Sequence, residues 1–137
     1  MMQRLAGATH ALLRIVAGLL FLHAGGLKIF GWFGGMPAGV TMTPLLAWAG
    51  WIELVCGTLI LLGLLTRPAA FIASGEMAFA YFIGHFPNGF WPIQNHGETA
   101  VLDCFLFLFF AANGAGPASL DSLIWKRRDR SARLAAA

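Results

Sequence analysis

Apolar and polar residues divide this chain into four long apolar stretches joined by short polar or glycine- and proline-rich segments. The stretches cover about 9–30, 44–65, 68–85 and 98–112. A transmembrane α-helix needs roughly 20 mostly apolar residues, so the first three have a spanning length and the fourth is short. The pattern therefore predicts an all-α integral membrane protein, a bundle of four transmembrane helices.

Composition agrees with a membrane protein. Of 137 residues, 58% are hydrophobic and 11% are charged, about half the charged share of an ordinary soluble domain. We expect one transmembrane domain over residues 1–125 and a basic tail over residues 126–137. No basic surface interleaved with stacking aromatic residues occurs, so nucleic acid is not an expected partner.

The basic residues indicate an orientation. Arg4, Arg14, Arg67 and the tail fall on one side of a four-pass arrangement, whereas the loops at 31–43 and 86–97 contain no Lys or Arg. Positive charges concentrate on the cytoplasmic side of membrane proteins. Both termini are therefore predicted to be cytoplasmic, in a multi-pass protein of the cytoplasmic membrane.

Each apolar stretch contains an ionisable residue: His23, Glu53, Glu76 and Asp103 in chain order. Such groups are costly in hydrocarbon, so they normally face a bundle interior and mark a site or a pathway. We expect the four side chains to share an internal chamber, displaced toward the loops at 31–43 and 86–97.

The charges of this chamber do not balance. Glu53, Glu76, Glu98 and Asp103 stand against Lys28 alone, and four carboxylates cannot all remain ionised beside one ammonium group in a low dielectric. Acids that share protons near neutral pH are what a proton relay or a quinone-reducing pocket requires. The structural alternative is that Lys28 simply pairs with one glutamate.

Simpler interpretations exist for other polar residues. Glu98 could be an acidic first-turn residue, which the helix dipole favours. His85 and His96 with Glu98 could bind a metal, but their spacing matches no recognised zinc pattern, and no metal is predicted. Cys56 and Cys104 lie in apolar stretches without a CxxC motif, so we expect buried thiols, or a disulfide if they meet at similar depth.

Small residues predict where helices approach closely. Gly18 and Gly25 are seven residues apart, as are Gly50 and Gly57. Each pair therefore lines one stripe of its helix, where backbones can touch.

The chain as a whole resembles the DoxX family. The resemblance covers nearly its full length and combines motifs that are individually weak. They are Leu12-Leu13-Arg14, Phe21-Leu22-His23-Ala24-Gly25 with Lys28, Glu53 with Gly57, Leu61 to Arg67, Ala80-Tyr81-Phe82 with His85, Phe90-Trp91-Pro92, Asn95-x-Gly97-Glu98, and Gly116-Pro117-x-Ser119-Leu120-Asp121.

The resemblance implies a small bacterial or archaeal membrane protein with four transmembrane helices. Proteins related to this family include the membrane subunit of thiosulfate:quinone oxidoreductase, and members of the family are linked to thiol and oxidative-stress redox systems. This implies a membrane component of a quinone-linked redox system, with quinone as the electron acceptor. No settled set of catalytic residues can be transferred, and the two cysteines are not part of the matching pattern.

The leading hypothesis assigns Glu53, Glu76 and His23 to proton relay. A second set would bind a polar head group or small anion near the loops: Lys28, His85, Asn95, Glu98 and Asp103. Expected partners are the lipid bilayer, a soluble redox protein, and a second copy of the chain. Two alternatives stay open: a non-enzymatic binding or assembly protein that docks a redox partner, and a small-solute carrier. The sequence does not decide whether the chain is itself catalytic.

Overall fold

The computed structural model describes residues 1–124, and these form helices joined by turns and loops. The predicted basic tail lies outside the described residues. The elements are α1 (Met2–Phe30), α2 (Pro44–Leu62), α3 (Thr66–Ala80), α4 (Pro92–Asn95) and α5 (Glu98–Asn113), with 3₁₀ turns at Trp32–Gly34 and Phe86–Asn88 and a π-helical turn at Tyr81–His85.

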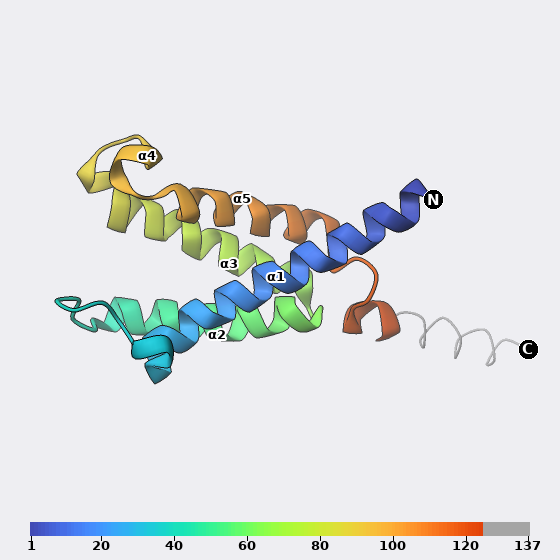
Figure 1. Ribbon diagram of the computed structural model, residues 1–137, viewed down its shortest axis with the longest axis horizontal. Coiled ribbons are helices and arrows are strands. Elements are labelled where there is room, and N and C mark those ends of the chain that lie inside the picture. The colour runs from blue at the N-terminus through green and yellow to red at the C-terminus, as the bar shows by residue number, and fades with distance from the viewer. Residues whose placement is uncertain (125–137) are drawn as a thin grey trace, which may run out of the picture.

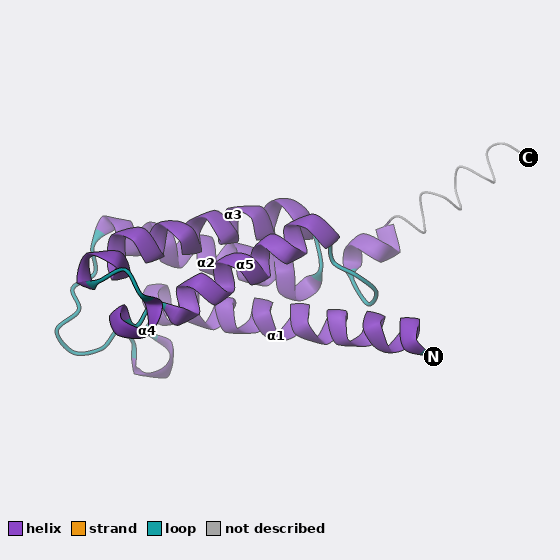
Figure 2. Cartoon of the chain, turned by 90° about the horizontal axis from the view of Figure 1, so that it is seen from above, coloured by secondary structure: helices purple, strands orange, loops and turns teal. Residues whose placement is uncertain are grey.

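The long helices are arranged as two pairs. Helix α1 packs along α2, α3 packs along α5, and α2 joins the pairs through α3 (Figures 1 and 2). At one end of the molecule α1 and α3 begin and α2 and α5 finish. We call it the Arg14 end, and the opposite end, which carries residues 31–43 and 86–97, the loop end.

Helix bounds differ from the predicted ones in ways that have local causes. Helix α1 begins at Met2, seven residues before the predicted start. Helix α2 starts at Pro44, where Thr43 accepts a hydrogen bond from the Leu46 amide, and ends before the left-handed Gly63. Proline suits the first helical turn and glycine the left-handed position after a helix. The predicted 86–97 loop contains α4.

The pairing of α1 and α2 depends on facing glycines. A Cβ atom added to Gly18 would lie 3.0 Å from the Gly57 carbonyl oxygen, and one added to Gly57 would lie 3.0 Å from that of Gly18. A Cβ at Gly25 would lie 2.6 Å from the Gly50 carbonyl oxygen. The close approach predicted at these glycines is confirmed, and any larger side chain would push the helices apart.

Within residues 1–124, two helices are long and apolar enough to span a membrane, α1 and α2. Helix α3 has 15 residues before its π-helical turn, and α5 has 16. At about 1.5 Å per residue, α5 is roughly 24 Å long. The remaining two of the four predicted spans are thus shorter than the length typical of a spanning helix.

Apolar residues nonetheless cover the outer surface of these shorter helices as well. Phe71, Phe79 and Phe82 on the α3 segment are more than half exposed, as are Leu102 and Phe105 on α5. The inward faces form one core, whose most buried members are Ile60, Ala70, Ala73, Phe107 and Phe110. A small helical protein with this much exposed apolar surface requires an apolar surrounding.

Candidate functional site

The first element of the site is an ion pair between α1 and α2. Lys28 Nζ lies 2.5 Å from both carboxylate oxygens of Glu53. The Glu53 side chain is 3% exposed and that of Lys28 is 18% exposed. Gly50 makes the pairing possible, because a Cβ there would lie only 3.0 Å from the Lys28 Cβ. The interpretation of Lys28 as the partner of a glutamate is confirmed.

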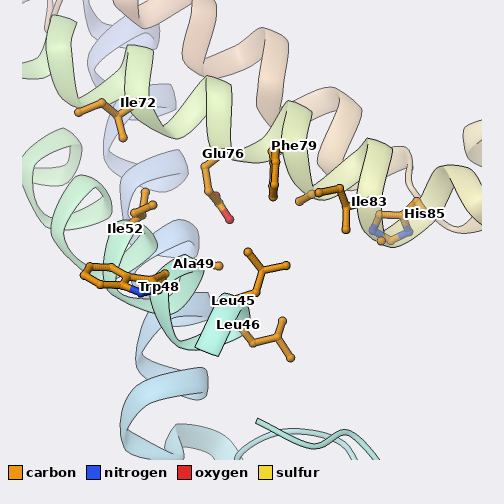
Figure 3. A pocket seen from close by; sticks show the side chains of 12 residues that line it. Leu45, Leu46, Trp48, Ala49, Ile52, Ile72, Glu76, Phe79, Ile83 and His85 are labelled. Carbon is orange, nitrogen blue, oxygen red and sulfur yellow. The ribbon is translucent and has the colours of Figure 1, made fainter. Parts of the chain in front are cut away.

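The second element is a cavity of about 430 Å³ between α2 and α3. Figure 3 shows Glu76 directed from α3 into this space, surrounded by apolar side chains from both helices. The residues that line it include Leu45, Trp48, Ala49, Ile52, Ile72, Phe79 and Ile83. Glu76 Oε2 is buried and has no hydrogen-bond partner among the residues that the structure describes. A buried acceptor without a partner costs roughly 1–3 kcal/mol, so this oxygen has unused hydrogen-bonding capacity.

Further titratable groups surround the two glutamates. Glu53 and Lys28 are near enough for their charges to act on Glu76. The charge of Asp103 on α5 affects the ionisation of Glu53, and the charge of Glu76 affects the ionisation of the Cys56 thiol on α2. The site therefore gathers Lys28, Glu53, Glu76 and Asp103 from all four long helices.

The outer rim of the site is built by the segment after α3. His85 lines the cavity, and its Nδ1 is hydrogen-bonded to the Asn95 carbonyl oxygen at 3.1 Å. Asn95 is buried, donates to the Gly89 carbonyl at 2.7 Å and accepts from the Gly97 amide at 2.8 Å. Tyr81 donates to the Phe90 carbonyl. The Asn95 side chain is thus engaged in shaping the loop, whereas His85 reaches the cavity.

Two predicted site residues lie apart from the glutamates. His23 is half-buried on α1, with its ring centroid 5.2 Å from that of Phe33 and 6.5 Å from that of Trp32. Within residues 1–124 no hydrogen bond joins it to Glu53 or Glu76. Glu98 is exposed in the first turn of α5, the position where the helix dipole favours a carboxylate. Their assigned roles stay predictions.

The two cysteines lie on different helices, Cys56 on α2 and Cys104 on α5. Cys56 and Cys104 are both free thiols. Ser74 Oγ donates to the Cys104 carbonyl oxygen at 2.8 Å and lies 3.6 Å from its sulfur. Within residues 1–124, no three His, Cys, Asp or Glu side chains gather closely enough to hold a metal ion.

Sequence reasoning missed the role of Arg14, which it placed at the membrane surface. Arg14 is 1% exposed. Its guanidinium donates to the carbonyls of Ile60 and Leu61 at 2.6 Å, of Ala118 at 2.7 Å and of Ala115 at 2.9 Å. Two of these carbonyls belong to the segment that contains the Gly116 to Asp121 motif and folds back over Arg14, and no periodic pattern in that segment signals the contact.

Neighbouring residues complete the Arg14 end. Asp121 accepts hydrogen bonds from the Leu65 and Thr66 amides at 2.9 and 3.1 Å, and so caps the start of α3. Arg67 donates to the Ala112 carbonyl at 2.6 Å at the end of α5. Negative groups at helix starts and positive groups at helix ends interact favourably with the helix dipole and so stabilise the helix.

Comparison with known proteins places the chain in a family. The DoxX family matches residues 9–86, more than half of the chain. An uncharacterized protein of Haemophilus influenzae is 44% identical over 122 residues, covering 85% of this chain and 91% of the relative. An uncharacterized membrane protein of Mycobacterium tuberculosis is 34% identical over 136 residues, covering 84% of this chain and 80% of the relative. No solved structure matches.

The family match and the relatives agree with the predicted resemblance. They also agree with the apolar helices and exposed apolar surface described above. This helical membrane protein belongs to the DoxX family.

Proposed function

We propose that this protein is the membrane component of a quinone-linked sulfur, thiol or oxidative-stress redox system, with the quinone bound in the cavity at Glu76. The observation that carries the proposal is the buried Oε2 atom of Glu76, which has no hydrogen-bond partner within residues 1–124 and faces a mainly apolar cavity. Small-molecule sites have this character: apolar walls with a few polar groups that fix orientation.

The proposal includes four membrane crossings. The lipid-like surface of α3 and α5 supports it, because exposed phenylalanine and leucine side chains on both helices need hydrocarbon around them. The π-helical turn lengthens α3 to residue 85, which makes this segment about 30 Å long. The short α5 then requires local thinning of the bilayer.

The proposed orientation puts the Arg14 end in the cytoplasm, in the cytoplasmic membrane. The loops at 31–43 and 86–97 contain no Lys or Arg, whereas Arg4 and Arg67 lie at the Arg14 end. This is the charge bias expected of a cytoplasmic side.

The residues present fit a quinone. A cavity of about 430 Å³ can take the flat ring of a quinone. The wide apolar wall formed by Trp48, Ile52 and Phe79 suits both this ring and the hydrocarbon tail of the quinone. Protonated Glu76 can donate to a carbonyl oxygen, and ionised Glu76 can accept from a hydroxyl group. His85, on the same wall toward the loop end, offers a second polar contact.

Reduction of a quinone to its quinol takes up two electrons, here from a sulfur or thiol donor on a partner protein, and two protons. Glu76 holds a proton at the cavity wall and gives it up there. Glu53, the charge that acts on Glu76 from α2, supplies the replacement. Lys28, the ion-pair partner of Glu53, carries a second exchangeable proton on Nζ, 2.5 Å from the Glu53 carboxylate. These three groups thus hold, move and replace protons beside a mainly apolar binding site.

A binding experiment tests the proposal. A quinone titrated into the protein in nanodiscs should quench the fluorescence of Trp48, which lines the cavity. Glu76→Leu should weaken binding at least about tenfold, because it removes the cavity's carboxyl group. Glu76→Gln should still bind but not support turnover. Phe71→Leu, on the outer surface of α3, is the matched control. Equal binding by wild type and Glu76→Leu would refute the proposal.

A further inference from the structure

We propose that Lys28 is the residue through which the site exchanges protons with water, and that this exchange takes place only at the loop end. The inference rests on the proposed function for its purpose, since the protons are used at Glu76. The route itself is a property of the chain and can be tested without a quinone. Three routes connect the Glu76 region to its surroundings, and the structure separates them.

The first route is the mouth of the cavity, and it faces lipid. Trp48, Ile72 and Phe79 line the cavity and are 70%, 52% and 54% exposed at the outer surface of α2 and α3. Side chains of this kind are exposed where hydrocarbon surrounds them. This opening admits an apolar ligand from the bilayer. Besides Glu76 its described lining carries one titratable side chain, His85, which lies at the loop end and is hydrogen-bonded to the Asn95 carbonyl oxygen.

The second route runs through the core to the Arg14 end, and it is closed. Ile60, Ala70, Ala73 and Phe110 are fully buried and fill this part of the molecule. Beyond them Arg14 donates to four backbone carbonyls, and a guanidinium does not release protons in proteins. The titratable groups of α2 and α5 on this side of the acids include the thiols of Cys56 and Cys104.

The third route passes through Lys28. Lys28 lies two residues before the end of α1, about 3 Å along the helix axis, so it is close to the loop end. Its side chain is 18% exposed and contacts both oxygens of a glutamate that is only 3% exposed. Glu53 in turn is within charge range of Glu76. From the surface inward, the order is thus water, the Lys28 ammonium group, Glu53 and Glu76.

Proton transfer along this route is physically reasonable because the ion pair is poorly solvated. Moving a proton from Lys28 Nζ to a Glu53 oxygen turns two charged groups into two neutral ones. Burial penalises both charges, so the neutral pair is much nearer in energy to the ion pair than it would be in water. Neutral Lys28 can then regain a proton from water, and protonated Glu53 can pass its proton to Glu76. The other charge that acts on Glu53 is Asp103 of α5, the competing entry point.

Chemical labelling of the native protein tests the access directly. A membrane-impermeant amine-acylating reagent is added to vesicles from the loop side or from the Arg14 side, and peptide mass spectrometry distinguishes Lys28 from Lys126, the other lysine. We expect Lys28 to be acylated from the loop side alone. Lack of labelling from that side, or equal labelling from both sides, overturns the inference. Either result leaves quinone binding at Glu76 to be judged by its own titration.

Turnover gives a second readout. Lys28→Met should slow proton-coupled reduction about 10²-fold at saturating quinone, the range of a lost proton-transfer group, with quinone affinity unchanged. Lys28→Arg keeps the charge and the pairing with Glu53 but cannot give up its proton, so it should fold normally and still be slow. An Arg variant with wild-type turnover would show that only the charge matters and would overturn the inference. So would an Asp103→Asn variant that slows turnover more than Lys28→Met.

Discussion

The two ends of this molecule bury charge in opposite ways. At the Arg14 end, the guanidinium meets four backbone carbonyls, and Asp121 meets two backbone amides. Toward the loop end, the Lys28 ammonium group contacts the two carboxylate oxygens of Glu53, and Glu76 keeps an oxygen without a partner among the described residues. The first arrangement is saturated and can only hold helices together. The second is unsaturated, which leaves bonding capacity for a ligand or a proton.

The largest effect is expected at Arg14. Arg14→Leu would remove a donor from four backbone carbonyls, of which that of Ile60 keeps a bond from the Gly63 amide, and each buried carbonyl left unpaired costs roughly 1–3 kcal/mol. We expect a loss of at least about 3 kcal/mol in the free energy of unfolding, measured by chemical denaturation in detergent micelles. Arg14→Lys should recover part of it. An Arg14→Leu variant as stable as wild type would show that the Arg14 end does not hold the fold together.

The next effect is an asymmetry within the ion pair. Lys28→Met leaves Glu53 buried at 3% exposure, a loss of about 3 kcal/mol, as for a broken buried pair. Glu53→Leu should cost less, because Lys28 is partly exposed and its long side chain can reach water. The double variant Lys28→Met/Glu53→Leu should be more stable than Lys28→Met alone. Strictly additive losses in this double-mutant cycle would mean that the two residues are not coupled.

A smaller effect is expected at the cap of α3. Asp121→Ala removes the acceptor for the Leu65 and Thr66 amides and should cost about 1–2 kcal/mol, as for other helix-start caps. Asp121→Asn keeps a side-chain oxygen and should cost less. Thermal unfolding of the two variants ranks them, and the opposite order would exclude capping as the role of Asp121.

Much of the loop-end site could be predicted from the sequence. A charge inside an apolar run signals a buried polar group and helix rise gives its approximate depth, so Lys28 could be expected to pair with a glutamate, but not with Glu53 in particular. Depth does not give the direction in which a side chain points around the helix. For this reason His23, at a suitable depth, was placed with the glutamates although its ring lies against Phe33.

The Arg14 end could not be predicted in the same way. Arg14 falls near the start of an apolar run, which is where surface arginines are common. Its burial depends on α1 beginning at Met2 and on residues 114–121 folding back across the helix ends. Both are tertiary features, and the glycine- and proline-containing segment after α5 carries no periodic pattern that would reveal them.

The smallest expected change in stability has the opposite sign and separates the two ends most clearly. Glu76→Leu removes a carboxyl group whose burial is uncompensated and replaces it with a side chain that suits the apolar cavity. We expect the free energy of unfolding to rise by about 1 kcal/mol, since removing an unsatisfied buried group is neutral or stabilising. Quinone binding should fall in the same variant. A residue kept at a cost to stability is retained for its function, so a stabilised variant without binding would identify Glu76 as functional. A destabilised Glu76→Leu protein would instead make Glu76 a packing residue like Arg14, and the contrast between the two ends would disappear.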